Sequence, residues 1–252
     1  MAFDIYVIIL LFLAGLFAGL INILIGLKGS IHRKHLNYCD CDAKYKWYEL
    51  IPMYSYISMR GNCKYCGRKM SIYYALLELL NGILFSLSYI YYGFSYEMIL
   101  FIILVCLATI IYVSDFKYYI ISNLPLLFFG GLILILKFIF FGYRTFLISV
   151  LSGVIIFVFM YLVKLLGNFL FKRESLGDGD IKLSVVFGFV FGIRLAIVSL
   201  IIGSFLAFPV ALFYSLKGND KEIPFGPYLI TGLCIVFVFM EPIRNFLSII
   251  FK

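Results

Sequence analysis

The sequence predicts an all-α polytopic membrane protein with about eight transmembrane helices and a small zinc-stapled cytoplasmic subdomain between the first two. Of its 252 residues, 64% are hydrophobic and only 13% are charged, and the mean hydropathy is +1.07. A soluble domain of this length does not need so much apolar surface. The apolar residues also gather into runs close to the ~20 residues with which a helix crosses a bilayer.

Eight apolar runs are the candidate spans. They cover residues 5–27, 71–92, 97–114, 122–141, 145–171, 181–193, 195–217 and 226–250. The run at 181–193 is short for a span of ~20 residues, and fusing it with the next run gives a seven-span alternative. Fusion would place Arg194 in the middle of the membrane, so we favour eight spans.

The distribution of Lys and Arg predicts the orientation of these spans. Nine of the 21 basic residues fall within residues 28–70, which places this segment in the cytoplasm. Both chain termini then lie outside the cytoplasm. The formal net charge of +8 is therefore attributed to membrane topology, and we expect membrane lipid as a partner and no nucleic acid.

Residues 28–70 form the one segment that can fold outside the membrane. A segment this short is not stable through a hydrophobic core alone and needs a staple such as a metal. Four cysteines lie in it: Cys39, Cys41, Cys63 and Cys66. The last two belong to a C-x-x-C-G knuckle, in which Gly closes the turn. Two pairs of thiolates suit a tetrahedral structural Zn²⁺ site, and cytoplasmic thiols stay reduced, which favours metal over disulfides.

The first cysteine pair leaves alternatives open. Cys39 and Cys41 are two residues apart, and in an extended chain such neighbours point to opposite sides. One of four nearby residues can replace one of them as a ligand: His32, His35, Asp40 or Asp42. A redox-active dithiol and unmetallated thiols are the other interpretations.

Two acidic residues at the edges of apolar runs are the candidate catalytic groups. Asp115 follows the third run, and Asp180 closes a G-D-G-D sequence just before the sixth. An acid at the edge of an embedded segment is costly unless it has a function. Two carboxylates within about 3–5 Å cannot both ionise easily, so one keeps its proton as an acid while the other activates water. We expect Asp115 and Asp180 to meet as such a proteolytic pair at the cytoplasmic face.

Helix positions suggest which acid holds the proton. Asp180 precedes a helix, where the dipole and the free N–H groups favour the anion, whereas Asp115 lies near a helix C-terminus. The hypothesis is that Asp115 holds the shared proton and Asp180 starts as the base. Asp178 is interpreted as a solvated neighbour. Glu78, inside the second run, is interpreted as a buried hydrogen-bonding group rather than a catalytic one.

Several motifs, taken in order, resemble those of type IV prepilin peptidases, which are membrane aspartic proteases of the G-x-G-D type. Residues 49–80 resemble the family's cytoplasmic loop and second span, and Asp115 with residues 121–125 resembles its first catalytic region. Residues 177–183 resemble the G-x-G-D-x-K-L motif, and residues 223–229 the late I-P-F-G-P motif. Each motif is weak alone, but all of them in order are specific.

The resemblance implies cleavage of the leader peptides of prepilins and pseudopilins, just after a Gly, at the cytoplasmic face of a bacterial inner membrane. It also implies, in many members, N-methylation of the new N-terminal residue with S-adenosylmethionine. By motif position, Asp115 and Asp180 are the catalytic residues. The implied organisation is a first span at 1–27, a zinc-binding, methyltransferase-associated subdomain at 28–70 and a protease core at 71–252.

Further residues of these motifs are interpreted as supporting ones. Gly177 and Gly179 free the backbone for conformations that a Cβ would forbid and let it approach an extended substrate. Lys182 either holds the geometry of an acid or extends toward the interface. A late Phe-Gly-Pro segment either shapes the mouth of the site or forms an ordinary turn: Phe225, Gly226 and Pro227.

Two other functions stay open. A proton-coupled transporter would carry acids near the middle of the bilayer on discontinuous helices, whereas Asp115 and Asp180 both map to one face. A non-enzymatic membrane scaffold that presents a zinc knuckle would tolerate Asp115→Ala and Asp180→Ala and lose its function only with the cysteines.

Overall fold

The computed structural model describes residues 2–28, 46–172, 174–216 and 223–250. It divides into two compact units, Met1–Ser114 and Asp115–Lys252. Within the described ranges the chain is helical apart from turns and one isolated bridge between Asn62 and Lys69. The all-α class predicted from composition is confirmed.

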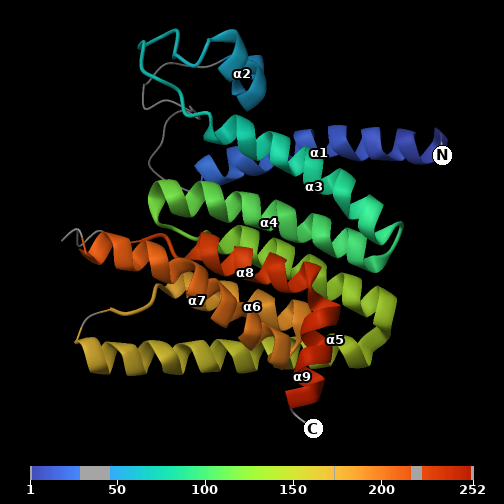
Figure 1. The fold of residues 1–252 in the computed structure, drawn as a ribbon, viewed down its shortest axis with the longest axis vertical. Coiled ribbons are helices and arrows are strands. Elements are labelled where there is room, and N and C mark those ends of the chain that lie inside the picture. Colours follow the sequence, from blue (N-terminus) through green and yellow to red (C-terminus); the bar gives the residue numbers. More distant parts are fainter. Residues whose placement is uncertain (1, 29–45, 173, 217–222, 251–252) are drawn as a thin grey trace. The chain divides into compact units, whose positions relative to one another are not determined.

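The first unit contains α1 (Ala2–Lys28), the 3₁₀ turn η1 (Trp47–Leu50), α2 (Pro52–Ser58), α3 (Tyr73–Tyr92) and most of α4 (Tyr96–Tyr118). The second unit begins in the last turn of α4 and contains α5 (Asn123–Phe171), α6 (Asp178–Phe191), α7 (Ile193–Leu216), α8 (Gly226–Val238) and α9 (Met240–Ile250) (Figure 1). Among the described residues, five helices are long and apolar enough to cross a membrane, or six if α8 and α9 are one bent span. The chain is therefore a polytopic membrane protein, and the count of eight spans stays a prediction.

α5 is two helical arms that fold back on each other at Gly142. This glycine has φ 79° and ψ −179°, which no helix interior allows. The Lys137 ammonium donates a hydrogen bond of 3.0 Å to the Ser149 hydroxyl, although twelve residues of continuous helix would separate these positions by ~18 Å. In Figure 1 the two arms meet at this bend and diverge away from it, and Phe189 of α6 lies near Gly130 of the first arm and Gly153 of the second. The arms correspond to the separate runs predicted at 122–141 and 145–171.

α6 is short and largely buried, and it packs against α5, α7 and α8. Its 14 residues span ~21 Å, less than the ~30 Å hydrocarbon core of a bilayer. Its contact with α5 is close, because a Cβ on Gly188 would lie 2.6 Å from the Gly153 Cα. This packing fixes the axis of α6 and thereby the position of its first turn, which carries Asp180.

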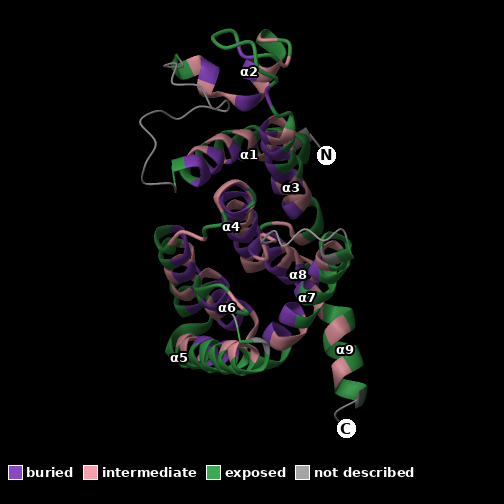
Figure 2. Ribbon diagram, turned by 90° about the vertical axis from the view of Figure 1, so that its left-hand side faces the viewer, coloured by how far each residue is buried: buried purple, intermediate pink, exposed green. Residues whose placement is uncertain are grey.

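The last predicted run, 226–250, is not one continuous helix. α8 ends at Val238, and α9 starts at Met240 with its axis bent by 81°. Pro242 explains the break, because its ring would clash with the Val238 carbonyl in a continuous helix, whereas proline is tolerated in the first turn of a new helix. Most of α9 and much of α5 are exposed (Figure 2), and the exposed side chains of α5 are largely apolar, as expected of a helix that faces lipid.

In the first unit, α1 packs closely along α3 through glycines. A Cβ on Gly15 would lie 2.7 Å from the Asn81 carbonyl oxygen. A small core joins this helix pair to α4 and to the segment after α2: Ile23, Leu27, Cys63, Met70, Tyr74, Leu77 and Val113. The segment that contains the second cysteine pair is thus docked on the helices of its own unit.

Candidate functional site

A cleft of about 460 Å³ in the second unit brings the two predicted carboxylates together. Asp115 comes from the last turn of α4 and Asp180 from the first turn of α6. The cleft is lined by Asp115, Tyr119, Glu174, Ser175, Leu176, Gly177, Asp180, Ile223, Pro224 and Phe225. Acids that are 65 positions apart in the sequence therefore face one space.

Asp115 is held by the N-terminus of α8. Its side chain is 5% exposed, and its Oδ2 accepts a hydrogen bond of 3.0 Å from the N–H of Gly226, the first residue of α8. A helix N-terminus carries unsatisfied N–H groups and the positive end of the helix dipole, and both favour a carboxylate anion. These contacts favour the anion of Asp115, and its burial acts in the opposite direction.

Asp180 lies in a different environment, at the start of α6 and outside the helices that are long enough to span a membrane. It is 9% exposed. Burial, reinforced by the charge of Asp115, raises the pKa of Asp180 to about 7, although a hydrogen bond with the Gly177 backbone acts in the opposite direction. These surroundings favour Asp180 as the holder of a shared proton. The helix dipoles favour the other order, with the proton on Asp115, so the protonation order within the pair stays a hypothesis.

The two glycines of the G-x-G-D motif provide space. Gly177 has φ −70° and Gly179 lies in the first turn of α6, so neither has the left-handed backbone that was expected to require glycine. A Cβ on Gly177 would lie 3.0 Å from the Asp180 Oδ2, and one on Gly179 would lie 2.9 Å from the Ile121 Cβ. Both positions are therefore occupied by glycine because neighbouring atoms approach closely.

The two other charged residues of this motif contact groups other than the acid pair. Asp178 is exposed and forms an ion pair of 2.6 Å with Lys164, whose ammonium holds the pKa of Asp178 below its usual value. The Lys182 ammonium donates a hydrogen bond of 3.1 Å to the Asn123 side chain at the start of α5. Lys182 thus ties the first turns of two helices together.

The late Phe-Gly-Pro segment forms the start of α8 and one wall of the cleft. Phe225 lines the cleft, Gly226 supplies the N–H that binds Asp115, and Pro227 occupies a first-turn position where its missing N–H costs nothing. An ordinary turn would not make these contacts. Of the two interpretations of this segment, the mouth of the site is the one that fits.

Sequence reasoning missed several residues of the cleft. Tyr119 follows α4 with φ 56°, an unusual value for a residue other than glycine, and its N–H donates to the Asp115 carbonyl at 2.9 Å. Ser175 fastens the loop before α6, because its N–H and hydroxyl both donate to the Asn168 side chain. The position of Tyr119, one turn after Asp115, was the available signal. No pattern in the sequence marked Ser175.

In the first unit, the C-x-x-C-G turn has the shape of a metal knuckle. The Cys63 N–H donates to the Arg68 carbonyl at 2.8 Å, and the Gly67 N–H donates to the Cys63 carbonyl at 2.8 Å. Gly67 has φ 70°, so glycine closes the turn as predicted. Cys39 and Cys41, with the alternative ligands between residues 32 and 42, lie outside the described residues. Within the described ranges no three potential ligands lie together, so the four-cysteine site stays a prediction.

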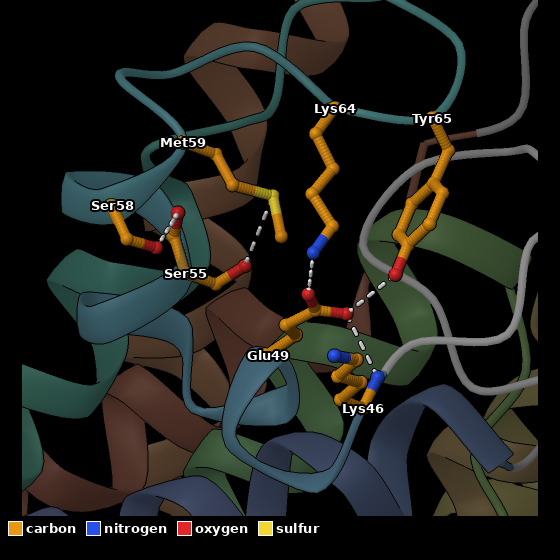
Figure 3. Close-up of polar contacts among 7 residues, drawn as sticks. All are labelled: Lys46, Glu49, Ser55, Ser58, Met59, Lys64 and Tyr65. Carbon is orange, nitrogen blue, oxygen red and sulfur yellow. Dashed lines mark hydrogen bonds and ion pairs between the residues drawn. The ribbon is translucent and has the colours of Figure 1, made fainter.

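A buried carboxylate locks this knuckle in place (Figure 3). Glu49 is 1% exposed and forms an ion pair with Lys64, and its Oε2 accepts hydrogen bonds from the Tyr65 hydroxyl at 2.9 Å and the Lys46 N–H at 2.8 Å. Burial alone would raise the pKa of Glu49, but the Lys64 ammonium and the two other donors hold it below its usual value. Lys64 and Tyr65 are the two residues between the cysteines of the knuckle.

Glu78 lies in α3 and does not line the acid cleft. It is 4% exposed, and its Oε2 accepts a hydrogen bond of 2.8 Å from the Met53 N–H in the first turn of α2. This contact fits the interpretation of Glu78 as a hydrogen-bonding group that positions a helix start.

Comparisons with known proteins agree with this geometry. Residues 9–92 match the model of the bacterial peptidase A24 N-terminal domain, and residues 98–212 match that of the type IV leader peptidase family. The chain is similar to prepilin leader peptidase/N-methyltransferases from three bacteria. Identity is 27% for the Bacillus subtilis protein, covering 79% of each chain, and 30% for the Xanthomonas campestris protein, covering 77% of this chain and 68% of the relative. It is 30% for the Vibrio cholerae protein, covering 78% of each. No solved structure matches the chain. With these relatives and a cleft that joins both motif acids, the chain belongs to the type IV leader peptidase family.

Proposed function

We propose that this chain is a membrane aspartic endopeptidase that removes the leader peptide of prepilins and pseudopilins, with Asp115 and Asp180 as its catalytic pair. The observation that supports this most directly is that both carboxylates line one cleft, where the charge of Asp115 acts on Asp180. Asp115 accepts an N–H from a helix start, and Asp180 has a pKa raised to about 7. A pair of acids in which one is ionised and the other protonated is the arrangement that peptide hydrolysis requires.

In the proposed reaction, the Asp115 carboxylate takes a proton from a water molecule as that water attacks the carbonyl carbon of the scissile peptide. Asp180 gives its proton to the carbonyl oxygen, so the developing oxyanion is neutralised. As the tetrahedral intermediate collapses, the proton held by Asp115 passes to the departing amine, Asp180 takes back a proton from one hydroxyl of the intermediate, and the C–N bond breaks. Water is the nucleophile throughout, so no covalent enzyme intermediate forms.

The charge distribution supports an active site at the cytoplasmic face. Positively charged segments tend to stay inside, and the positions of Lys and Arg favour that side for the end of α4 and the start of α6. Cleavage is expected just after a Gly, at the junction of a polar leader and a membrane-embedded segment. Both chain termini then lie on the opposite face of the inner membrane.

The N-terminal part of the chain is proposed to methylate the new N-terminus. S-adenosylmethionine, when bound, would supply the methyl group. The cysteine knuckle fits a structural Zn²⁺ site, with Cys63 and Cys66 as two ligands and Cys39 and Cys41 as the others. Metal analysis of the purified protein should give one zinc per chain, and Cys63→Ser should lose it.

The test uses purified protein in lipid, a synthetic prepilin and mass spectrometry of the products. Asp115→Asn and Asp180→Asn should each lower the cleavage rate at least about a hundredfold. Asp178→Asn is the matched control, because Asp178 lies two residues from Asp180 but is exposed and paired with Lys164. With S-adenosylmethionine present, the mature product should gain the mass of one methyl group. Full activity of either Asn variant at the acid pair would refute the proposal.

A further inference from the structure

A second, apolar groove adjoins the acid cleft in the same unit. It has a volume of about 370 Å³ and lies between α7 and the second arm of α5. One wall is a continuous face of α7 that includes Ile197, Ile201, Phe205 and Phe208. These positions recur every three or four residues, as one face of a helix does, and they extend over ~16 Å. The groove is therefore long enough for about three turns of a second helix.

The groove and the acid cleft are neighbours. Leu176, in the loop before α6, and Phe225, the residue before α8, line both spaces. A polypeptide whose scissile bond lies between Asp115 and Asp180 would reach the groove once it has passed these two side chains. The polar cleft and the apolar groove together fit a substrate in which a polar segment is joined to an apolar one.

The groove is not filled by side chains of the described residues. α5 packs broadly on α6, and α7 on α8, but α5 and α7 contact each other only sparingly. Phe205 is 72% exposed and Phe208 is 61% exposed. The polar side chain in the lining, Ser204, donates its hydroxyl hydrogen to the Leu200 carbonyl at 2.8 Å. The wall therefore offers packing surface and no free hydrogen-bond donor to a polar ligand.

We propose that this groove holds the apolar helical segment of the substrate that adjoins the scissile bond, an inference that rests on the proposed peptidase function. Inside a bilayer the hydrophobic effect does not favour a helix over lipid tails as the occupant of a groove, so close packing decides which of them binds. A segment tethered to the peptide in the acid cleft also has a high effective concentration at the groove, which a free lipid chain lacks. The groove then acts as a specificity site, because it selects a substrate helix whose side chains fit between Phe205 and α5.

Photocrosslinking tests the occupant directly. A benzoylphenylalanine is placed at Phe205, or at Leu206 as the control, in the Asp180→Asn background so that the peptide stays uncut. Leu206 is the adjacent α7 residue, 37% exposed, and does not line the groove. The probe is a synthetic prepilin peptide with its leader, the scissile bond and ~20 following residues, in phosphatidylglycerol/phosphatidylethanolamine vesicles. Position 205 should capture the apolar segment of the peptide at least about tenfold more than position 206. Capture of lipid alone at 205, or equal capture at both positions, would overturn the inference.

A blocking variant gives an independent readout. Ser204→Trp should fill the groove and lower kcat/KM for this peptide about tenfold. A short peptide that ends a few residues after the scissile bond should be cut as by the unmodified protein, and Leu206→Trp should change neither rate. Cleavage without selective capture at 205 would leave the peptidase function standing and remove the groove inference. Selective capture at 205 by a protein that cuts no prepilin would support the groove inference and refute the peptidase function.

Discussion

The coupling of the two acids can be tested by removing one charge and titrating the other group. In Asp115→Asn, the side chain keeps its size while the negative charge that faces Asp180 is lost. Asp180 itself stays buried at the first turn of α6, because its packing against α5 is unchanged. The variant therefore separates the effect of charge from the effect of burial on one carboxyl group.

The structure sets the size and direction of the expected change. The pKa of Asp180 is raised from 3.8 to about 7, first by burial and second by the charge of Asp115. This rise corresponds to roughly 4 kcal/mol of preference for the protonated carboxyl. Because Asp115→Asn removes only the second cause, the pKa of Asp180 should fall but stay above 3.8.

Infrared titration of the carboxyl stretch measures the pKa of Asp180 in the Asp115→Asn variant. The difference between spectra of Asp115→Asn and of the double variant Asp115→Asn/Asp180→Asn isolates the signal of Asp180. An unchanged pKa of about 7 would refute the coupling, because the charge of Asp115 would then have no effect. A pKa of 3.8 or lower would instead refute the role assigned to burial.

Four other predictions follow from named contacts. Because Asp180 must hold a proton, kcat/KM should fall about tenfold per pH unit above about pH 7 in a pH–rate profile. Gly177→Ala places a Cβ 3.0 Å from the Asp180 Oδ2, so kcat should fall about tenfold in steady-state assays. Above about pH 4 the unfolded chain releases the Asp180 proton, whereas the folded protein keeps it up to about pH 7, so the stability falls across this range. Asp180→Asn should therefore melt at a higher temperature than the unmodified protein at pH 8 but not at pH 4. Glu49→Gln loses the charge that pairs with Lys64, which should cost about 1–3 kcal/mol and speed proteolysis of the knuckle.

Three of these predictions have the following controls or contrary results. Gly131→Ala is the control for Gly177→Ala, because a Cβ at Gly131 has nothing within 4 Å; equal losses in both variants would contradict the steric argument. A flat rate profile between pH 6 and about pH 9 would refute the assignment of the catalytic proton to Asp180. A Glu49→Gln protein as protease-resistant as its parent would show that Glu49 does not lock the knuckle.

The location of the acid pair was predictable because it depends on local patterns. Acids are rare beside apolar runs, so Asp115 and Asp180 stand out in the sequence, and both appear in the cleft. The arms of α5 were also predictable, since the apolar pattern is interrupted around Gly142. The bend before α9 was not, because Pro242 breaks the helix inside a stretch whose composition stays apolar.

The features that sequence reasoning could not supply come from long-range contacts. Asp115 accepts a hydrogen bond from the Gly226 N–H, 111 positions away in the sequence, and no local sequence pattern predicts this contact. The glycines of the motif were assigned to backbone freedom, whereas Gly177 and Gly179 are required by the closeness of Asp180 and Ile121. Likewise, the protonation order was argued from helix dipoles, although burial, which depends on the tertiary packing, has the larger effect on Asp180.

The most direct test of the account is the rate of prepilin cleavage by Asp115→Asn, Asp180→Asn and the double variant in one lipid preparation. If the two acids act as one unit, each single variant should lose nearly all activity, and the double variant should lose no more than either. Losses that multiply in the double variant, or a single variant that cuts at the normal rate, would mean that the two carboxylates do not share one reaction.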